Sequence, residues 1–386
     1  MSMIARTKQQ FAFAALEVQR GLLALPSSAQ SLILAANLTA SQKPTYTDSP
    51  EIQNTRGLVD RFQEGLSAGE FNLKLLARPT GAGSLPAGAV LFQSLMGLQN
   101  QSANAVTYAQ ATGKPSFSLC YRRGYMVFYC LGATVHELKL ALGHQGPVEL
   151  DFSGRFLTRL WMGDDQMAVA SLAAATQIAV TDAQRFAVGG RVYNPLCAAA
   201  GGTADEGAGQ GYEIVAVDLV NHLLTLAAPL AFDWALGEEV KGWLPASLSQ
   251  GSPILAKECS LLVGGVAGKV QTAELTLSDG VHYIEDEITN LGHPTDYIEA
   301  ERKVSGSYSG YFRKEDAGLF AQGLSGAQAS LDFVLGSQAG GRMTFSLPKV
   351  PFEVPGEAES GPALLLKRSF VALETLGNDS VSLRFD

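Results

Sequence analysis

The sequence has few of the side chains that carry metal or redox chemistry. Its four cysteines are widely spaced, and none forms the Cys-x-x-Cys pair that holds zinc or runs thiol exchange. Its five histidines are scattered, and none lies in a His-Glu-x-x-His or other paired-ligand spacing. We therefore predict no catalytic residue, no metal site and no cofactor, and we expect buried free thiols at Cys120, Cys130, Cys197 and Cys259.

Long hydrophobic runs are also missing. The longest apolar stretches, Leu223 to Leu230 and Met167 to Ala175, fall short of the ~20 residues that a membrane span requires. At the N-terminus, Arg6 and Lys8 precede a segment that polar residues interrupt, so it lacks the continuous apolar core of a secretory signal. We expect a protein that has no membrane segment and is made in the cytoplasm.

Basic residues are fewer than acidic ones, with 28 Lys and Arg against 37 Asp and Glu. The formal net charge is −9, which argues against a site that grips a phosphate backbone, because such a site needs a basic footprint. The glycine-rich stretch from Ala198 to Gly211 contains Asp205 and Glu206 and no lysine, so it would repel a phosphate group instead of cradling it.

Strand-like alternation dominates what is present. Phe71, Leu73 and Leu75 alternate with polar residues, and so do Leu138, Leu140 and Leu142, which predicts half-buried antiparallel strands. The same period recurs in Val148 to Phe152, Ala273 to Leu277, Met343 to Leu347 and Val381 to Phe385. Residues 5 to 24 instead carry apolar positions at helical spacing with Pro26 behind them, which favours a short helix or an irregular arm.

At 386 residues the chain suggests more than one domain. The sequence pattern changes between about residues 165 and 250, where short apolar runs alternate with turn residues. These runs predict short strands, one of them from Phe186 to Val192. We interpret residues 170–245 as a small inserted β domain, with a first domain over 1–160 and a second over 255–386.

Two segments resemble each other. Ser67 to Phe71 is followed by Leu91-Phe92 and Gly97, and Val304 to Tyr308 is followed by Leu319-Phe320 and Gly323. In each copy a strand leads into a short helix, and each follows a long polar stretch, which indicates a duplicated architecture.

The first 160 residues resemble the tail-tube (major tail) proteins of long non-contractile-tailed bacteriophages. No single motif carries the likeness, but the order of the motifs does. They are Arg6 to Gln9 with Glu17 and Gly21, the Gly69 strand, Leu91 to Gly97, Val106 to Tyr108, Ser116 to Tyr121, Gly132 to Val135 and Pro147 to Gly154.

The resemblance implies a mainly β fold with minor α: two tandem tail-tube-type β-sandwich or barrel domains with the small β domain inserted. It further implies a structural virion protein of the tail, assembled in the host cytoplasm, whose rings stack into a hollow tube for genome passage. Such tubes generally have sixfold symmetry, so three chains of two domains each would give a pseudo-sixfold ring. Its partners would be itself and other tail proteins, and genomic DNA would pass without specific binding.

Two groups of residues are candidates for these roles. A lumen lined by carboxylates would repel phosphate, and the candidates on polar strand faces are Glu70, Glu137, Glu149, Asp151 and Glu274. The polar segment from Gln42 to Glu64 is long for a structureless connection, which is typical of a functional loop that here would reach the next ring. Its apolar anchors are Tyr46, Ile52, Leu58 and Phe62.

Other functions stay open at this stage. A tail-end adaptor or a secretion-system tube protein would share the fold. A β-rich hydrolase is the third alternative, but Ser153 lacks the Gly-x-Ser-x-Gly elbow and the pair Asp164-Asp165 is typical of a solvated loop. His136 and His144 could meet across a hairpin and bind a metal, although positions on a strand surface fit them better.

Overall fold

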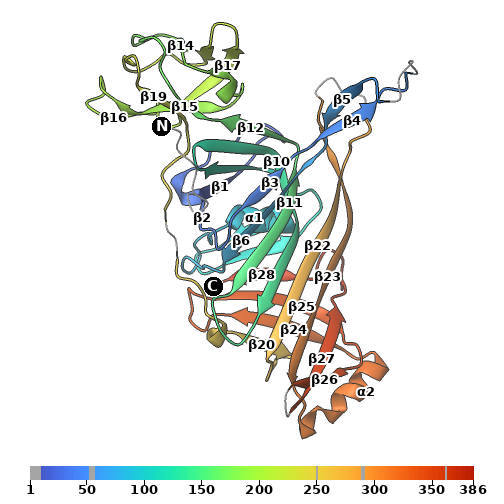
Figure 1. Cartoon of the computed structure of the whole chain (residues 1–386). Helices are drawn as coiled ribbons and strands as arrows, with labels where there is room; N and C mark the ends of the chain where they lie inside the picture. Colours follow the sequence, from blue (N-terminus) through green and yellow to red (C-terminus); the bar gives the residue numbers. More distant parts are fainter. Residues whose placement is uncertain (1–9, 52–56, 249–250, 288–291, 361–362) are drawn as a thin grey trace.

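The computed structural model describes residues 10–51, 57–248, 251–287, 292–360 and 363–386. The fold is mainly β, as expected, with antiparallel pairing throughout the described strands and two short α-helices. Figure 1 shows an elongated molecule with a small sheet at one end and helix α2 at the other.

The largest sheet contains one four-strand arrangement twice. The first copy runs in the order β3 (Thr39–Ser41), β6 (Gly69–Leu76), β11 (Glu149–Phe156) and β10 (Met126–Leu142). The second runs in the order β22 (Thr272–Tyr283), β23 (Tyr297–Tyr311), β27 (Ala363–Val371) and β26 (Gly356–Ser360). They join where β10 pairs with β22, with Leu138 opposite Leu277. The predicted strand at Phe71 to Leu75 is confirmed, because these side chains are buried and their neighbours are not.

Each copy leads from its second strand into a short helix, as predicted. β6 precedes α1 (Ala89–Met96), and β23 precedes the 3₁₀ turn η4 (Lys314–Ala317) and α2 (Gly318–Ser325).

A second sheet lies across the core from these strands. Its order is β21 (Val266–Gly268), β20 (Ser260–Val263), β24 (Gln328–Leu335), β25 (Met343–Pro351), β28 (Ser382–Phe385), β8 (Val106–Gln110) and β7 (Gly97–Gln101). One hydrophobic cluster joins both sheets and α1, from Ala12 to Phe385. Inside it, the Phe92 ring of α1 lies 5.4 Å from Phe152 and 5.4 Å from Phe385. Strands from both ends of the chain therefore build one core.

The N-terminal segment is a strand, so the expectation of a helix or irregular arm is wrong over its described part. β1 (Gln10–Leu16) pairs with β9 (Phe117–Arg123) and with β2 (Ser31–Leu32), which follows the turn η1 (Ser28–Gln30). Both faces of β1 are buried, with Ala12 and Ala14 in the main core and Phe13 in a second cluster. A strand that is buried on both faces lacks the alternation that marks half-buried strands, so its sequence does not reveal it.

The middle of the chain forms a separate seven-stranded sheet on one end of the molecule (Figure 1). Its strands are β13 (Asp164–Gln166), β14 (Gln177–Ala179), β15 (Arg191–Cys197), β16 (Thr203–Asp205), β17 (Tyr212–Asp218), β18 (Leu223–Leu226) and β19 (Glu239–Gly242), with η2 (Ala183–Arg185) between β14 and β15. Its core is shared, because Phe13, Val127 and Tyr129 of the neighbouring strands belong to the same cluster. These neighbours are β1, β9, β10 and β12 (Thr158–Met162).

Two local predictions need correction. The run from Phe186 to Val192 is mostly turn, and β15 begins only at Arg191. Residue 190 must be glycine, because a Cβ there would lie 2.1 Å from the Met162 sulfur. The segment from Gln42 to Glu64 is not structureless, since β4 (Pro44–Asp48) and β5 (Arg61–Leu66) form a hairpin in it. The remaining short element is η3 (Ala256–Glu258).

Candidate assembly surfaces

The five carboxylates proposed for a lumen lie on one face of the large sheet. Their strands, β6, β11, β10 and β22, are neighbours, and inward side chains such as Leu73, Leu138 and Leu275 are fully buried. In the register, Glu149 and Glu274 both lie opposite Ala141. The polar face therefore runs without a break from the first copy of the four-strand arrangement into the second.

Cations accompany these carboxylates. Glu149 accepts a hydrogen bond from Lys74 at 3.1 Å, Glu137 pairs with Lys139 at 2.8 Å and Glu70 with Arg155 at 3.2 Å. Hydrogen bonds from Lys74 and Lys139 to these carboxylates raise the pKa of both lysines. Lys303 and Lys367 lie on the same face by register. The face thus carries charges of both signs.

His136 lies at an irregularity of β10, where the pairing with β11 shifts between Val135 and Glu137. Its ring is partly buried beside Glu137, Arg155 and Glu70, and burial lowers its pKa. His144 lies beyond the end of β10 at Leu142. Among the described residues, no group of three or more histidine, cysteine or acidic side chains could hold a metal ion.

Hairpin β4–β5 projects from the body of the molecule (Figure 1). Tyr46, Leu58 and Phe62 are 51%, 57% and 50% exposed, and Ile52 lies outside the described residues. Tyr46 is opposite Gln63 and Thr47 is opposite Phe62, so the two aromatic rings emerge from opposite faces. A two-stranded hairpin with large apolar side chains on both faces has no core of its own to bury them.

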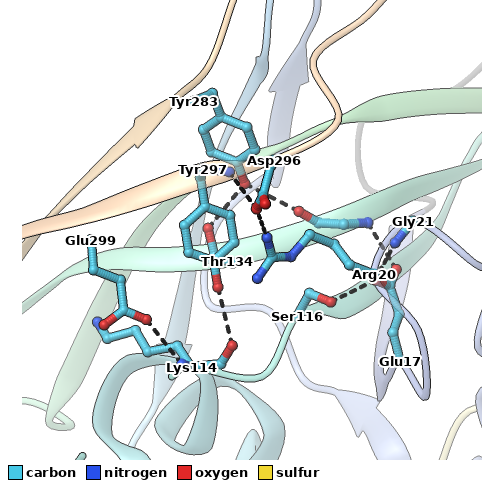
Figure 2. A network of polar contacts seen from close by, with 11 residues as sticks. Glu17, Arg20, Gly21, Lys114, Ser116, Thr134, Tyr283, Asp296, Tyr297 and Glu299 are labelled. Carbon is cyan, nitrogen blue, oxygen red and sulfur yellow. Dashed lines mark hydrogen bonds and ion pairs between the residues drawn. The ribbon is translucent and has the colours of Figure 1, made fainter. Parts of the chain in front are cut away.

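A polar network fixes the base of this hairpin (Figure 2). The Leu66 N–H donates to the Gly292 carbonyl at 2.7 Å, which ties β5 to the connection between β22 and β23. On that connection, Asp296 pairs with Arg20, whose guanidinium lies 3.9 Å from the centre of the Tyr297 ring.

Glu17 is the centre of this network and was not foreseen as such. Its carboxylate accepts hydrogen bonds from the Gly21 and Gly132 N–H groups at 2.8 Å each, and from the Ser116 and Ser118 hydroxyls at 2.8 and 2.9 Å. All five residues belong to the ordered motifs on which the family resemblance depends. Contacts between residues so far apart in the chain are set by the fold and have no local sequence signal.

A buried ion pair lies next to this network. The Lys114 ammonium contacts the Asp279 carboxylate, and the two side chains are 0% and 3% exposed. Arg302 donates to the same carboxylate at 3.0 Å, while the Lys114 N–H donates to Glu299 at 3.0 Å. These contacts link the loop after β8 to β22 and β23, and so connect the two copies of the four-strand arrangement.

The large sheet ends in short strands on both sides. Within the described residues, β3 pairs only with β6, and β26 only with β27. Their outer edges keep unpaired backbone groups, which can pair with another chain.

The thiols agree with the sequence expectation. Cys120, Cys130 and Cys197 are buried and Cys259 is partly buried, all as free thiols. None of the helices in the described ranges is long and apolar enough to cross a membrane.

Comparison with known proteins identifies a family. Residues 244–373 match the family described as phage tail tube protein, which is about a third of the chain and contains β20 to β27 with α2. No curated protein matches the chain. The motifs that carried the resemblance in the sequence lie before this segment, on and around the first copy of the four-strand arrangement, with Arg6 to Gln9 outside the described residues. The match falls on the segment that contains the second copy. The match over residues 244–373 supports a bacteriophage tail tube protein.

Proposed function

We propose that three chains of this protein close into a pseudo-sixfold ring and that the rings stack into the hollow phage tail tube. The observation that carries the proposal is the four-strand arrangement, which occurs twice in one sheet and is joined through β10 and β22. A ring closes when the same junction repeats between chains, with β26 of one chain against β3 of the next.

The internal junction gives the register of the junction between chains. Phe71 of β6 corresponds to Tyr308 of β23, since both lie at equivalent positions of the repeat and oppose Ala40 and Ala273 respectively. By the same correspondence Ala358 is the counterpart of Lys139, and Lys43 is the counterpart of Thr276. Lys139 lies opposite Thr276 inside the chain, so Ala358 should lie opposite Lys43 of the next chain.

The polar face of the large sheet is the proposed lumen surface, with Glu70, Glu137, Glu149, Asp151 and Glu274 among its side chains. The apolar face is not available for this role because it is buried in the core. On the polar face Lys74, Lys139 and Arg155 are paired with carboxylates, which reduces the positive charge that would meet the DNA backbone. Genomic DNA would therefore pass without specific binding.

Hairpin β4–β5 is the proposed contact between successive rings, through the exposed side chains of Tyr46, Leu58 and Phe62. The middle domain, residues 170–245, would project from the outside of the tube, and the segments 1–160 and 255–386 would form its wall. The finished tube would belong to the virion tail, contact other tail proteins, and assemble in the host cytoplasm without catalysis.

Electron microscopy of the purified protein at high concentration tests this function. Negative-stain images should show hollow filaments, whereas lone rings or monomers would favour a tail-end adaptor. A disulfide cross-link tests the junction, since facing strand residues have Cβ atoms about 4.5–5.5 Å apart. The double variant Ala358→Cys with Lys43→Cys should give chains cross-linked in threes under oxidation, and each single variant is its control.

A further inference from the structure

The helices of the two copies are packed differently. α1 buries Leu91, Phe92, Leu95 and Met96 in the main core, whereas none of the described side chains of α2 is buried. Leu319 and Phe320, the counterparts of Leu91 and Phe92, are only partly covered, and Leu324 is 79% exposed. α2 therefore leaves open a space that α1 fills in the first copy.

This space is a groove of about 390 Å³ between α2, β23, β27 and the β20–β21 hairpin. Its apolar lining includes Val266, Tyr311 and Leu319. Tyr311 and Val266 are 45% and 71% exposed, so the groove opens to the surface. We call it the α2 groove.

A buried arginine lines the α2 groove. Arg368 is 1% exposed, its guanidinium lies 4.4 Å from the centre of the Phe352 ring, and it donates one hydrogen bond, to Tyr308 at 3.3 Å. Its Nε and one terminal nitrogen have no hydrogen-bond partner among the described residues. Lys269 and Arg313 line the same groove, where Asp316 already accepts the Arg313 N–H. Leaving buried donors unpaired destabilises the chain, and an arriving acceptor would relieve this destabilisation.

Hairpin β4–β5 has the complementary chemistry. It exposes Tyr46 and Phe62 for the apolar walls. Its acidic residues for the cationic lining are Glu51, Asp60 and Asp48, the last of which pairs with Arg61 at 2.6 Å. It also lies at the opposite end of the molecule (Figure 1). β23 begins at Tyr297, beside the connection that holds β5, and ends at Tyr311 in the groove. Complementary surfaces at opposite ends produce head-to-tail contacts that do not close, which is the geometry of a filament.

We propose that the α2 groove receives hairpin β4–β5 of a copy in the next ring. The inference rests on the proposed tube function and names the acceptor that its hairpin requires. An acidic side chain of the incoming hairpin reaches the free donors of Arg368, and the aromatic rings cover Leu319 and Val266.

Two variants test the hairpin and the groove separately. The hairpin variant Tyr46→Ser with Phe62→Ser keeps an intact groove, and the groove variant Leu319→Asp with Lys269→Glu keeps an intact hairpin. Matched controls on the middle sheet and on η3 are Val220→Ser and Lys257→Glu, both at exposed positions. Circular dichroism and size-exclusion chromatography establish that each variant folds and forms rings.

Pelleting and negative-stain microscopy then measure stacking. Each variant alone should yield rings and at least tenfold less tube than the wild type, while the controls form tubes. A mixture of the two should yield paired rings that grow no further, because only one hairpin–groove contact is available between them. Tubes from the groove variant, or a mixture without paired rings, would overturn the inference and leave the tube function standing. Absence of tubes from the wild type would overturn both.

Discussion

Asp279 pairs with two basic side chains in the interior of the protein. Its carboxylate is 3% exposed and contacts the cationic groups of Lys114 and Arg302. The change Asp279→Asn should lower the free energy of unfolding by about 3–5 kcal/mol, because the Arg302 guanidinium then loses its counter-charge. Lys114, whose pKa burial lowers to about 7, loses its partner as well. Lys114→Met should cost less, since Arg302 still neutralises Asp279. Urea unfolding measures both, and Glu239→Gln, which breaks the more exposed pair with Lys241 at 2.6 Å, should change stability by less than about 1 kcal/mol.

His136 should make stability depend on pH. Burial lowers its pKa in the folded chain, so the unfolded chain takes up a proton first as the pH falls below about 6.5, the ordinary value for histidine. Stability is then lost as the pH falls through that value towards the lower pKa of the folded state. The urea midpoint should drop between pH 7.5 and 5.5 more in the wild type than in His136→Gln. Equal drops in the two proteins would exclude this role for His136.

Residue roles were the least predictable feature of the sequence. In the sequence Asp205 was only an acidic residue of a glycine-rich stretch, yet its carboxylate is 2% exposed and accepts hydrogen bonds from Tyr212 at 2.8 Å and Trp234 at 2.9 Å. Arg368 lies in a strand, and only the three-dimensional packing shows that it is buried in a groove. Both roles depend on contacts across the fold, on which local patterns carry no information.

Elements with one buried face were predictable, and the others were not. β6, β22 and β25 alternate cleanly between buried and less buried residues, and the sequence predicted all three. β1 is buried on both faces and was mistaken for a helix or arm. The hairpin β4–β5 was missed because both of its faces are largely exposed, so no alternation between apolar and polar residues marks it.

Removing hairpin β4–β5 tests its role directly. Deletion of Thr45 to Gly57, part of which lies outside the described residues, should give soluble rings or single chains that no longer stack. The core should be unaffected, because the described hairpin side chains contribute nothing to the main cluster. Sedimentation velocity distinguishes rings from tubes, and tubes of normal length from this variant would show the hairpin to be passive.

Removing the middle sheet tests whether it lies outside the tube. Replacement of residues 170–245 by a Gly/Ser linker should leave assembly intact and reduce the outer diameter. The excision uncovers Val127 and Tyr129, which are fully buried against this sheet, so the melting temperature should fall. Replacing both Val127 and Tyr129 by Thr in the excised variant should restore its solubility, because the uncovered apolar surface is then smaller. A folded variant that forms no tubes would contradict the peripheral placement.

At the scale of the whole molecule, the two copies of the four-strand arrangement share one sheet and one core. The duplication was visible in the sequence from two short segments. Their joining through β10 and β22 was not visible, because pairing between distant strands leaves no local signal. In our proposal this junction is the template for the contact between chains, so the number of chains in a ring is its central quantity.

A cryo-electron-microscopy cross-section of assembled tubes measures that number most directly. The proposal predicts three chains per ring. The first and second copies of the four-strand arrangement would alternate around the lumen, with Ala358 next to Lys43 of the adjacent chain. Six chains per ring, with only one of the two copies at the lumen and the other on the exterior, would contradict it.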